Sequence, residues 1–150
     1  MPTSTTALLH TDFIVITLEH DGKIVRYRRT SVPFPKLESA KHTYDQVLGT
    51  YDRLGRRGRG LLVDSRDAVG RNDPEFEELL VAFRNRAVPG FVAHVVLMRT
   101  SVGLLQAQRI DRRMPSQGSR PAHMATDNEQ EAIRFLLQHV QAWRPTSPSA

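Results

Sequence analysis

The stretch Gly60-Leu61-Leu62-Val63-Asp64 decides the fold of this chain, because it is a short apolar run that ends abruptly at a charged residue. An apolar run of this length, with no alternating polar residues, is typical of a β-strand that is covered on both faces. Helices cover such strands, so the sequence predicts an α/β domain with this strand inside it. Asp64 is then expected at the carboxyl end of the strand, where open α/β sheets bind ligands.

A β-hairpin is predicted on the N-terminal side of this strand. Residues 13–18 are rich in β-branched side chains, and residues 23–29 alternate apolar with basic ones. Between them, Asp21 and Gly22 suit a two-residue turn, because Gly accepts positive φ and Asp tolerates it. The alternation puts Val25 and Tyr27 on one face of the sheet and arginines on the other, so that second face is expected to be wet or polar.

Helices are predicted from apolar residues spaced three and four positions apart. One such stripe covers residues 37–54 and ends at Gly55, a suitable C-terminal cap. A second helix is expected to begin at Asp73-Pro74-Glu75, since Asp can cap and Pro fits the first helical position. The closing helix is expected to be capped by Asp127, with Gln130 three residues later as its capping-box partner.

The remaining elements complete a single domain. Residues 91–98 and 123–126 are predicted strands, and 101–110 is a weaker helix. The order β-β-α-β-α-β-α-β-α predicts one α/β domain over residues 12–142, with a mixed sheet that opens with an antiparallel hairpin and about four helices. Residues 1–11 are expected to be a flexible lead-in, and residues 143–150 a disordered tail.

The composition excludes several classes of protein. The 150 residues contain no cysteine, which excludes disulfides, thiolate catalysis and Cys-ligated zinc. No apolar run approaches the roughly 20 residues of a membrane span, and no secretory signal is recognisable, so a cytoplasmic protein is expected. The six histidines form neither a helical pair nor a metalloprotease motif, so we expect no metal, and no cofactor motif occurs.

The excess of basic residues admits two interpretations. Lys and Arg total 21 against 16 acidic residues, giving a formal charge of +5 and a pI near 10.2. Such a balance favours polyanions or acidic partner surfaces, although nearly all the cations are arginines and this bias can reflect the coding genome. The basic loop that follows the first helix is the candidate anion or nucleic-acid site, and a helix cap with solvated arginines is the alternative. Its candidate residues are Arg53, Arg56, Arg57 and Arg59.

Polar residues directly after the central strand raise the alternative of a small-molecule enzyme. Asp64, Ser65 and Asp67 could bind Mg²⁺, accept a phosphoryl group or act as a base. The spacing of the two acids does not match a haloacid-dehalogenase site, and the chain has no lysine beyond Lys41 for a receiver-type site. The simpler interpretation is that these side chains bind turn and helix-entry amides, so no catalytic residue is assigned.

Three patterns together resemble the SpoIIAA-like branch of the STAS superfamily, named after sulfate transporters and anti-sigma factor antagonists. They are the opening hairpin over 13–29, the strand 60–64 that leads through a polar loop to the helix at 73–80, and the closing strand, acidic turn and helix over 125–137. The resemblance covers residues 12–142 and implies a non-enzymatic, regulatory module that binds another protein or senses a small molecule.

The resemblance also implies a phosphorylated Ser or Thr at the start of the helix that follows the central strand. This chain has no Ser or Thr between Ser65 and Thr100, and Asp73 stands at the helix start, where it could supply a fixed negative charge. The partner is expected to contact this junction, because a helix N-terminus beside two arginines can receive an anion. The candidate partner-binding residues are Asp64, Ser65, Arg66, Asp67, Arg71, Asn72 and Asp73.

Overall fold

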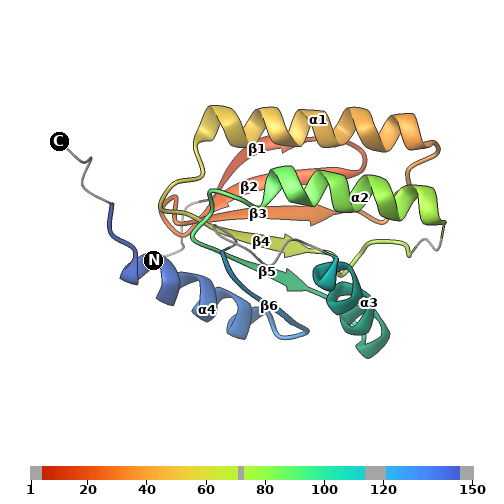
Figure 1. Cartoon of the computed structure of the whole chain (residues 1–150). Helices are drawn as coiled ribbons and strands as arrows, with labels where there is room; N and C mark the ends of the chain where they lie inside the picture. Colours follow the sequence, from red (N-terminus) through yellow and green to blue (C-terminus); the bar gives the residue numbers. More distant parts are fainter. Residues whose placement is uncertain (1–4, 71–72, 114–120, 146–150) are drawn as a thin grey trace.

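The computed structural model describes residues 5–70, 73–113 and 121–145. Six strands form one sheet in the order β1-β2-β3-β4-β5-β6, with β1–β3 antiparallel and β3–β6 parallel. This single mixed sheet, with four helices in the described residues, confirms the predicted α/β class (Figure 1). The elements are β1 (Thr6–His10), β2 (Ile14–Glu19), β3 (Ile24–Arg29), α1 (Leu37–Leu54), β4 (Gly60–Asp64), α2 (Pro74–Ala87), β5 (Ala93–Leu97), α3 (Ser101–Arg112), β6 (Ala122–Thr126) and α4 (Glu129–Ala142).

The β2–β3 hairpin turns as predicted. Asp21 and Gly22 both have positive φ, 56° and 82°, and the Lys23 amide donates to the His20 carbonyl at 3.1 Å. Positive φ at both central residues is typical of a primed turn, and His20 before them also has positive φ, 53°. Glu19 then pairs with Ile24, which fixes the register of the hairpin and the face on which each β3 side chain lies.

The central strand β4 lies between β3 and β5, parallel to both, and all five of its residues are buried. Because successive side chains of a strand point to opposite faces, Leu61 and Val63 join one apolar core and Leu62 joins another. The prediction of an interior strand that carries Asp64 to its carboxyl end is therefore confirmed.

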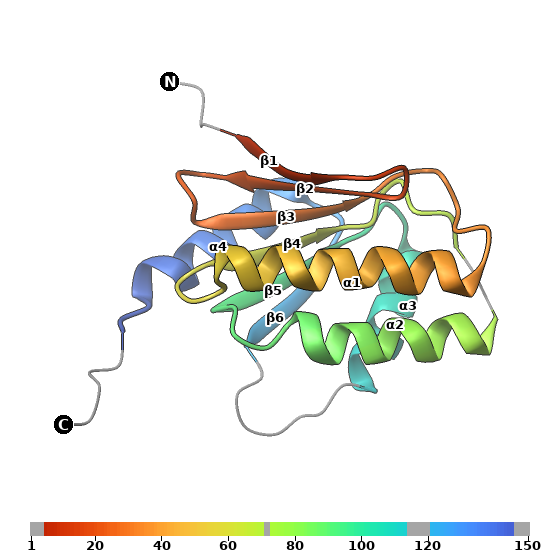
Figure 2. The ribbon, with the colours of Figure 1, turned by 90° about the horizontal axis from the view of Figure 1, so that it is seen from above.

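The helices form two layers, one on each face of the sheet. Residues of α1, α2 and α3 share a core with Tyr27, Leu61 and Val96, whereas Ala132 and Leu136 of α4 pack on the opposite face with Leu62. Figure 2 shows α1 and α2 side by side over one face, with α4 behind the strands. We call the first side the three-helix face and the second the α4 face.

The structure corrects two predicted helix caps. The α4 cap is Asn128, whose side chain accepts from the Glu131 amide at 3.0 Å, and not Asp127 with Gln130. Asp73 does occupy the N-cap position of α2, before Pro74, but its side chain accepts no capping hydrogen bond. The acidic first turn of α2 therefore favours the helix through its charge.

Both ends of the chain depart from expectation where the structure describes them. Residues 6–10, expected to belong to a flexible lead-in, form the edge strand β1 against β2. At the other end, Trp143 is half-buried and its ring lies beside Gly58. The rest of the predicted lead-in and tail, residues 1–4 and 146–150, lies outside the described residues.

Candidate functional site

The carboxyl ends of β3–β6 meet at one edge of the sheet, where the sequence predicts the site. Arg28 pairs with Asp64, and Asp64 with Leu97, so the ends of three parallel strands lie in register. The Ser65 amide donates to the Leu97 carbonyl at 2.9 Å, which ties the loop after β4 to the neighbouring strand. We call this region, where the loops following β3, β4 and β5 begin, the carboxyl edge.

Asp64 is the centre of an ion-pair cluster on the α4 face. The residue is 2% exposed, and its carboxylate accepts from Arg66 Nε (2.9 Å, to Oδ1) and Nη2 (2.8 Å, to Oδ2). Arg26 Nη1 donates to the same Oδ2 at 3.0 Å and to Glu129 Oε1 at 2.8 Å. Arg26 Nε binds Glu19 at 2.9 Å, so strands, loop and α4 are joined through two arginines.

These contacts decide the charge state of Asp64. Burial by itself would raise its pKa, but the hydrogen bonds from Arg66 and the charges of Arg66 and Arg26 outweigh burial and hold the pKa below its usual value. Asp64 is therefore an ionised carboxylate whose two oxygens are already occupied. A general base or metal ligand needs a lone pair directed at its substrate, and this arrangement offers none.

Asp67 lies on the exposed side of the same edge. Its carboxylate binds Arg99 Nη2 at 2.8 Å and lies 4.0 Å from Arg28 Nη1, so it connects the segments that follow β4 and β5 with the end of β3. Its arginine partners, Arg28 and Arg99, differ from those of Asp64, which are Arg26 and Arg66. The two acids that the enzyme hypothesis combines therefore belong to different ion pairs.

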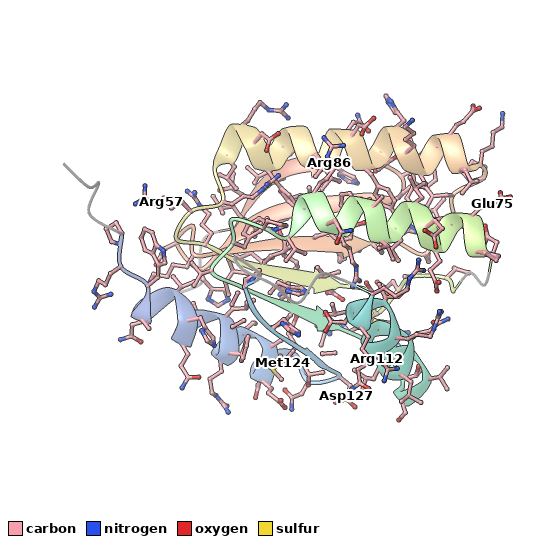
Figure 3. The ribbon with its side chains drawn as sticks, viewed as in Figure 1. Arg57, Glu75, Arg86, Arg112, Met124 and Asp127 are labelled. Carbon is pink, nitrogen blue, oxygen red and sulfur yellow. The ribbon has the colours of Figure 1, made fainter. Side chains whose placement is uncertain are left out.

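The rest of the predicted partner surface is only partly described. Ser65 lines the cavity described below, on the three-helix face. Arg71 and Asn72 lie outside the described residues. Asp73 is half-buried at the start of α2, and Glu75 extends outward at the same helix end (Figure 3).

The four arginines of the predicted anion site do not form one open cluster. Arg59 Nε donates to the Gly22 carbonyl and Nη1 to the Gly55 carbonyl, both at 2.9 Å, so this side chain holds two turns together. Arg56 is paired with Asp52 at 3.0 Å, and Arg53 donates to Thr50 at 3.3 Å. Figure 3 shows Arg57 near the end of α4, where its guanidinium carbon lies 5.6 Å from the centre of the Trp143 ring. These contacts favour the structural interpretation of the loop.

On the three-helix face, a cavity of about 170 Å³ lies between the sheet and the helices α1, α2 and α3. Its wall is mainly apolar, and its largest polar side chains are three tyrosines and three arginines: Tyr27, Tyr44, Tyr51, Arg29, Arg84 and Arg109. Ser65, Glu77, His94 and Gln106 also line it. Sequence reasoning missed this site because it placed the tyrosines on apolar stripes. The available signal was Arg29, which follows Val25 and Tyr27 at the period of two and so lies at an inward position.

Exposed apolar side chains gather in the segments that follow the parallel strands. Val32 follows β3, Val69 follows β4, and Val102 and Leu105 lie in the first turns of α3 after β5. The last three are 50%, 72% and 66% exposed. Isolated exposed apolar residues are ordinary, but a group at one edge is typical of an interaction surface.

The described residues provide neither a metal site nor a membrane span. No group of three or more His, Asp or Glu side chains among them is arranged to hold a metal ion. None of the helices in those same ranges is long and apolar enough to cross a bilayer. Comparisons with protein-family models, curated proteins and solved structures find no match for this chain. The resemblance to STAS domains therefore rests on the sequence patterns quoted above.

Proposed function

We propose that this chain is a non-enzymatic, STAS-like regulatory module that binds another protein through its carboxyl edge. The observation that carries the proposal is the contrast between the two kinds of side chain at this edge. The acids suited to chemistry are held by arginines, Asp64 by Arg26 and Arg66, and Asp67 by Arg99. The apolar side chains of Val69 and Val102, in the segments that follow β4 and β5, are exposed.

The proposed surface consists of Val69, Val102 and Leu105, with the Asp67–Arg99 ion pair beside them. The ion pair joins the loop after β4, two residues before Val69, to Arg99, two residues before α3 begins. Val69 and Gly103 also line one cavity, which supports their proximity. An apolar centre with charged groups beside it is the usual composition of a protein-binding surface.

The test begins with capture of the partner from the native cell, followed by binding measurements with the purified pair. Replacing Val69 and Val102 together by Glu is expected to weaken binding at least tenfold, because two charges would be desolvated at the interface. Asn85→Glu is the matched control, since Asn85 is exposed near the C-terminal end of α2. Equal affinities for the double variant and the wild type would contradict the proposed surface.

A further inference from the structure

The cavity on the three-helix face is lined by a buried cation that has no counter-ion among the described residues. Arg29 is the last residue of β3 and lies on the same face as Val25 and Tyr27. Its residue exposure is 8%, and its Nη1 atom is buried without a hydrogen-bond partner in the described part of the chain. The guanidinium carbon lies 4.2 Å from the centre of the Phe34 ring, a cation–π contact that satisfies no N–H group.

A buried N–H group without an acceptor costs free energy, and in native proteins most such groups have a partner. Arg29 is also a lining residue of the cavity. An acceptor in the cavity would satisfy its orphaned Nη1, and a planar carboxylate matches the guanidinium fork best.

Other residues of the cavity wall also favour a negatively charged ligand. Arg84 of α2 also lines the cavity; burial lowers its pKa, and the Tyr27 and Tyr44 phenols and Asp111 offset part of this effect. Burial raises the pKa of the Tyr27 and Tyr51 phenols, so both remain protonated and can donate hydrogen bonds.

Glu77 is the acidic residue among the described lining side chains, and its charge is already balanced. Its carboxylate oxygens bind Arg109 at 2.5 Å and Arg113 at 2.6 Å. The cavity thus presents cations and neutral hydrogen-bond donors to a ligand. Its acid, Glu77, is paired with Arg109 of α3 and with Arg113, the residue that follows α3.

Apart from Ser65, His94 and Gln106, the remainder of the wall is apolar and aromatic. Tyr44 stacks on Phe83 with ring centres 4.1 Å apart, and Leu61 and Val63 of β4 form the floor. An apolar cavity of roughly 150 Å³ is large enough to hold benzene. The volume here therefore suits a ligand whose body is a single ring or a short branched chain.

We propose that this cavity binds a small organic carboxylate with an aromatic or branched apolar body, its carboxylate on Arg29 and Arg84 and its body against Phe83 and the β4 floor. This ligand site goes beyond the proposed partner surface and does not depend on it. The loop after β4 borders both, through Ser65 and Val69.

The experiment titrates the purified chain with benzoate, benzamide and acetate, followed by ¹H–¹⁵N NMR and calorimetry. Benzoate and benzamide have the same shape, so their affinity ratio reports the charge; acetate reports the contribution of the ring. Benzoate is expected to bind about tenfold tighter than either, with shifts at the amides around β3, β4 and α2. No binding of benzoate at about 10 mM, or equal affinities of benzoate and benzamide, would overturn the proposal.

Arg29→Met tests the assigned contact and Arg28→Met is its matched control. Arg28 is the preceding residue on the same strand, but it lies on the opposite face with its side chain 42% exposed. In Arg29→Met the ratio of benzoate to benzamide affinity is expected to fall severalfold toward one, with benzamide binding retained and Arg84 still present, whereas Arg28→Met keeps the wild-type ratio.

Retained benzamide binding also shows that the Arg29→Met cavity is folded. If that variant does not fold, Arg84→Met is the second variant, and it is expected to lower the ratio in the same direction. A wild-type ratio in the folded Arg29→Met variant, or in Arg84→Met where Arg29→Met fails, would refute the assignment.

Discussion

At the residue scale, Asp64 shows how neighbouring residues can determine the role of an acid at a strand end. The position alone suggests a catalytic or metal-binding carboxylate. The contacts suggest a structural one, because Arg66 occupies both oxygens and Arg26 adds a third charged hydrogen bond. The alternation in β3 predicts that Arg26 and Arg28 share a face, but pairing Arg26 with Asp64 also requires β3 to lie beside β4. That adjacency is a property of the sheet, so local patterns could not supply it.

Asp64→Asn is expected to lower the free energy of unfolding by about 3 kcal/mol at neutral pH, because it leaves two partly buried guanidinium groups without their shared carboxylate. Urea denaturation followed by circular dichroism measures the change. Asp67→Asn is the control at an exposed ion pair, with an expected loss below about 1 kcal/mol. Equal losses for the two variants would contradict the central role of the buried cluster.

The pH dependence of the same variant follows from the lowered pKa of Asp64. A carboxyl group with a lower pKa in the folded than in the unfolded chain stabilises the fold above the unfolded value, about 3.9. That contribution disappears as the pH falls through the folded pKa. The stability difference between wild type and Asp64→Asn is therefore expected to be full at pH 7 and to shrink below about pH 4. A difference that stays constant down to about pH 2 would show that the charge of Asp64 does not contribute.

At the element scale, the start of α4 shows why a cap can be predicted in kind and misplaced by one residue. Asp127 and Asn128 both suit the cap, and each has an acid or amide three residues later, Gln130 or Glu131. The choice depends on where the chain leaves β6, which ends at Thr126. The Thr126 hydroxyl accepts from the Asn128 amide at 3.1 Å, which sets the turn so that Asn128 becomes the cap.

Asn128→Ala is expected to destabilise the chain by about 1 kcal/mol, since it removes the acceptor of the Glu131 amide. Asp127→Ala changes the adjacent exposed residue and is expected to cost only a few tenths of a kcal/mol through the helix dipole. Urea midpoints of the two variants give the comparison directly. A larger loss for Asp127→Ala would return the cap to the residue predicted from sequence.

The edge strand β1 is not predicted from the sequence, for a physical reason different from the one that displaces the α4 cap. Its residues are exposed or half-buried, and its register against β2 shifts between Ala7 and Leu9, so it lacks a regular alternation. Such a strand forms because β2 offers unpaired backbone groups at the edge of the sheet. An interior strand such as β4 can be recognised from the apolar pattern of its own residues. The formation of β1 depends instead on pairing with β2, which its own residues do not reveal.

At the scale of the whole molecule, one sheet connects two cores that local patterns treat as unrelated. Leu61 belongs to the three-helix core and Leu62 to the α4 core, although they are consecutive residues of β4. The alternation that divides them was predictable, but the placement of α4 alone on its face was not. Aromatic residues provide a separate spectroscopic probe of unfolding for each face of the sheet. All three tyrosines lie in the three-helix core, and the single tryptophan, Trp143, follows α4.

Leu62→Ala tests whether the two layers unfold together. It is expected to cost about 2–5 kcal/mol, because it opens a cavity under α4 in a fully buried strand. Since β4 serves both cores, tyrosine near-ultraviolet dichroism and Trp143 fluorescence are expected to give one shared urea midpoint, lowered together. Leu61→Ala, the same change on the other face, is expected to lower both probes together as well. A Trp143 midpoint that falls in Leu62→Ala while the tyrosine midpoint stays at its wild-type value would show that α4 unfolds independently of the sheet.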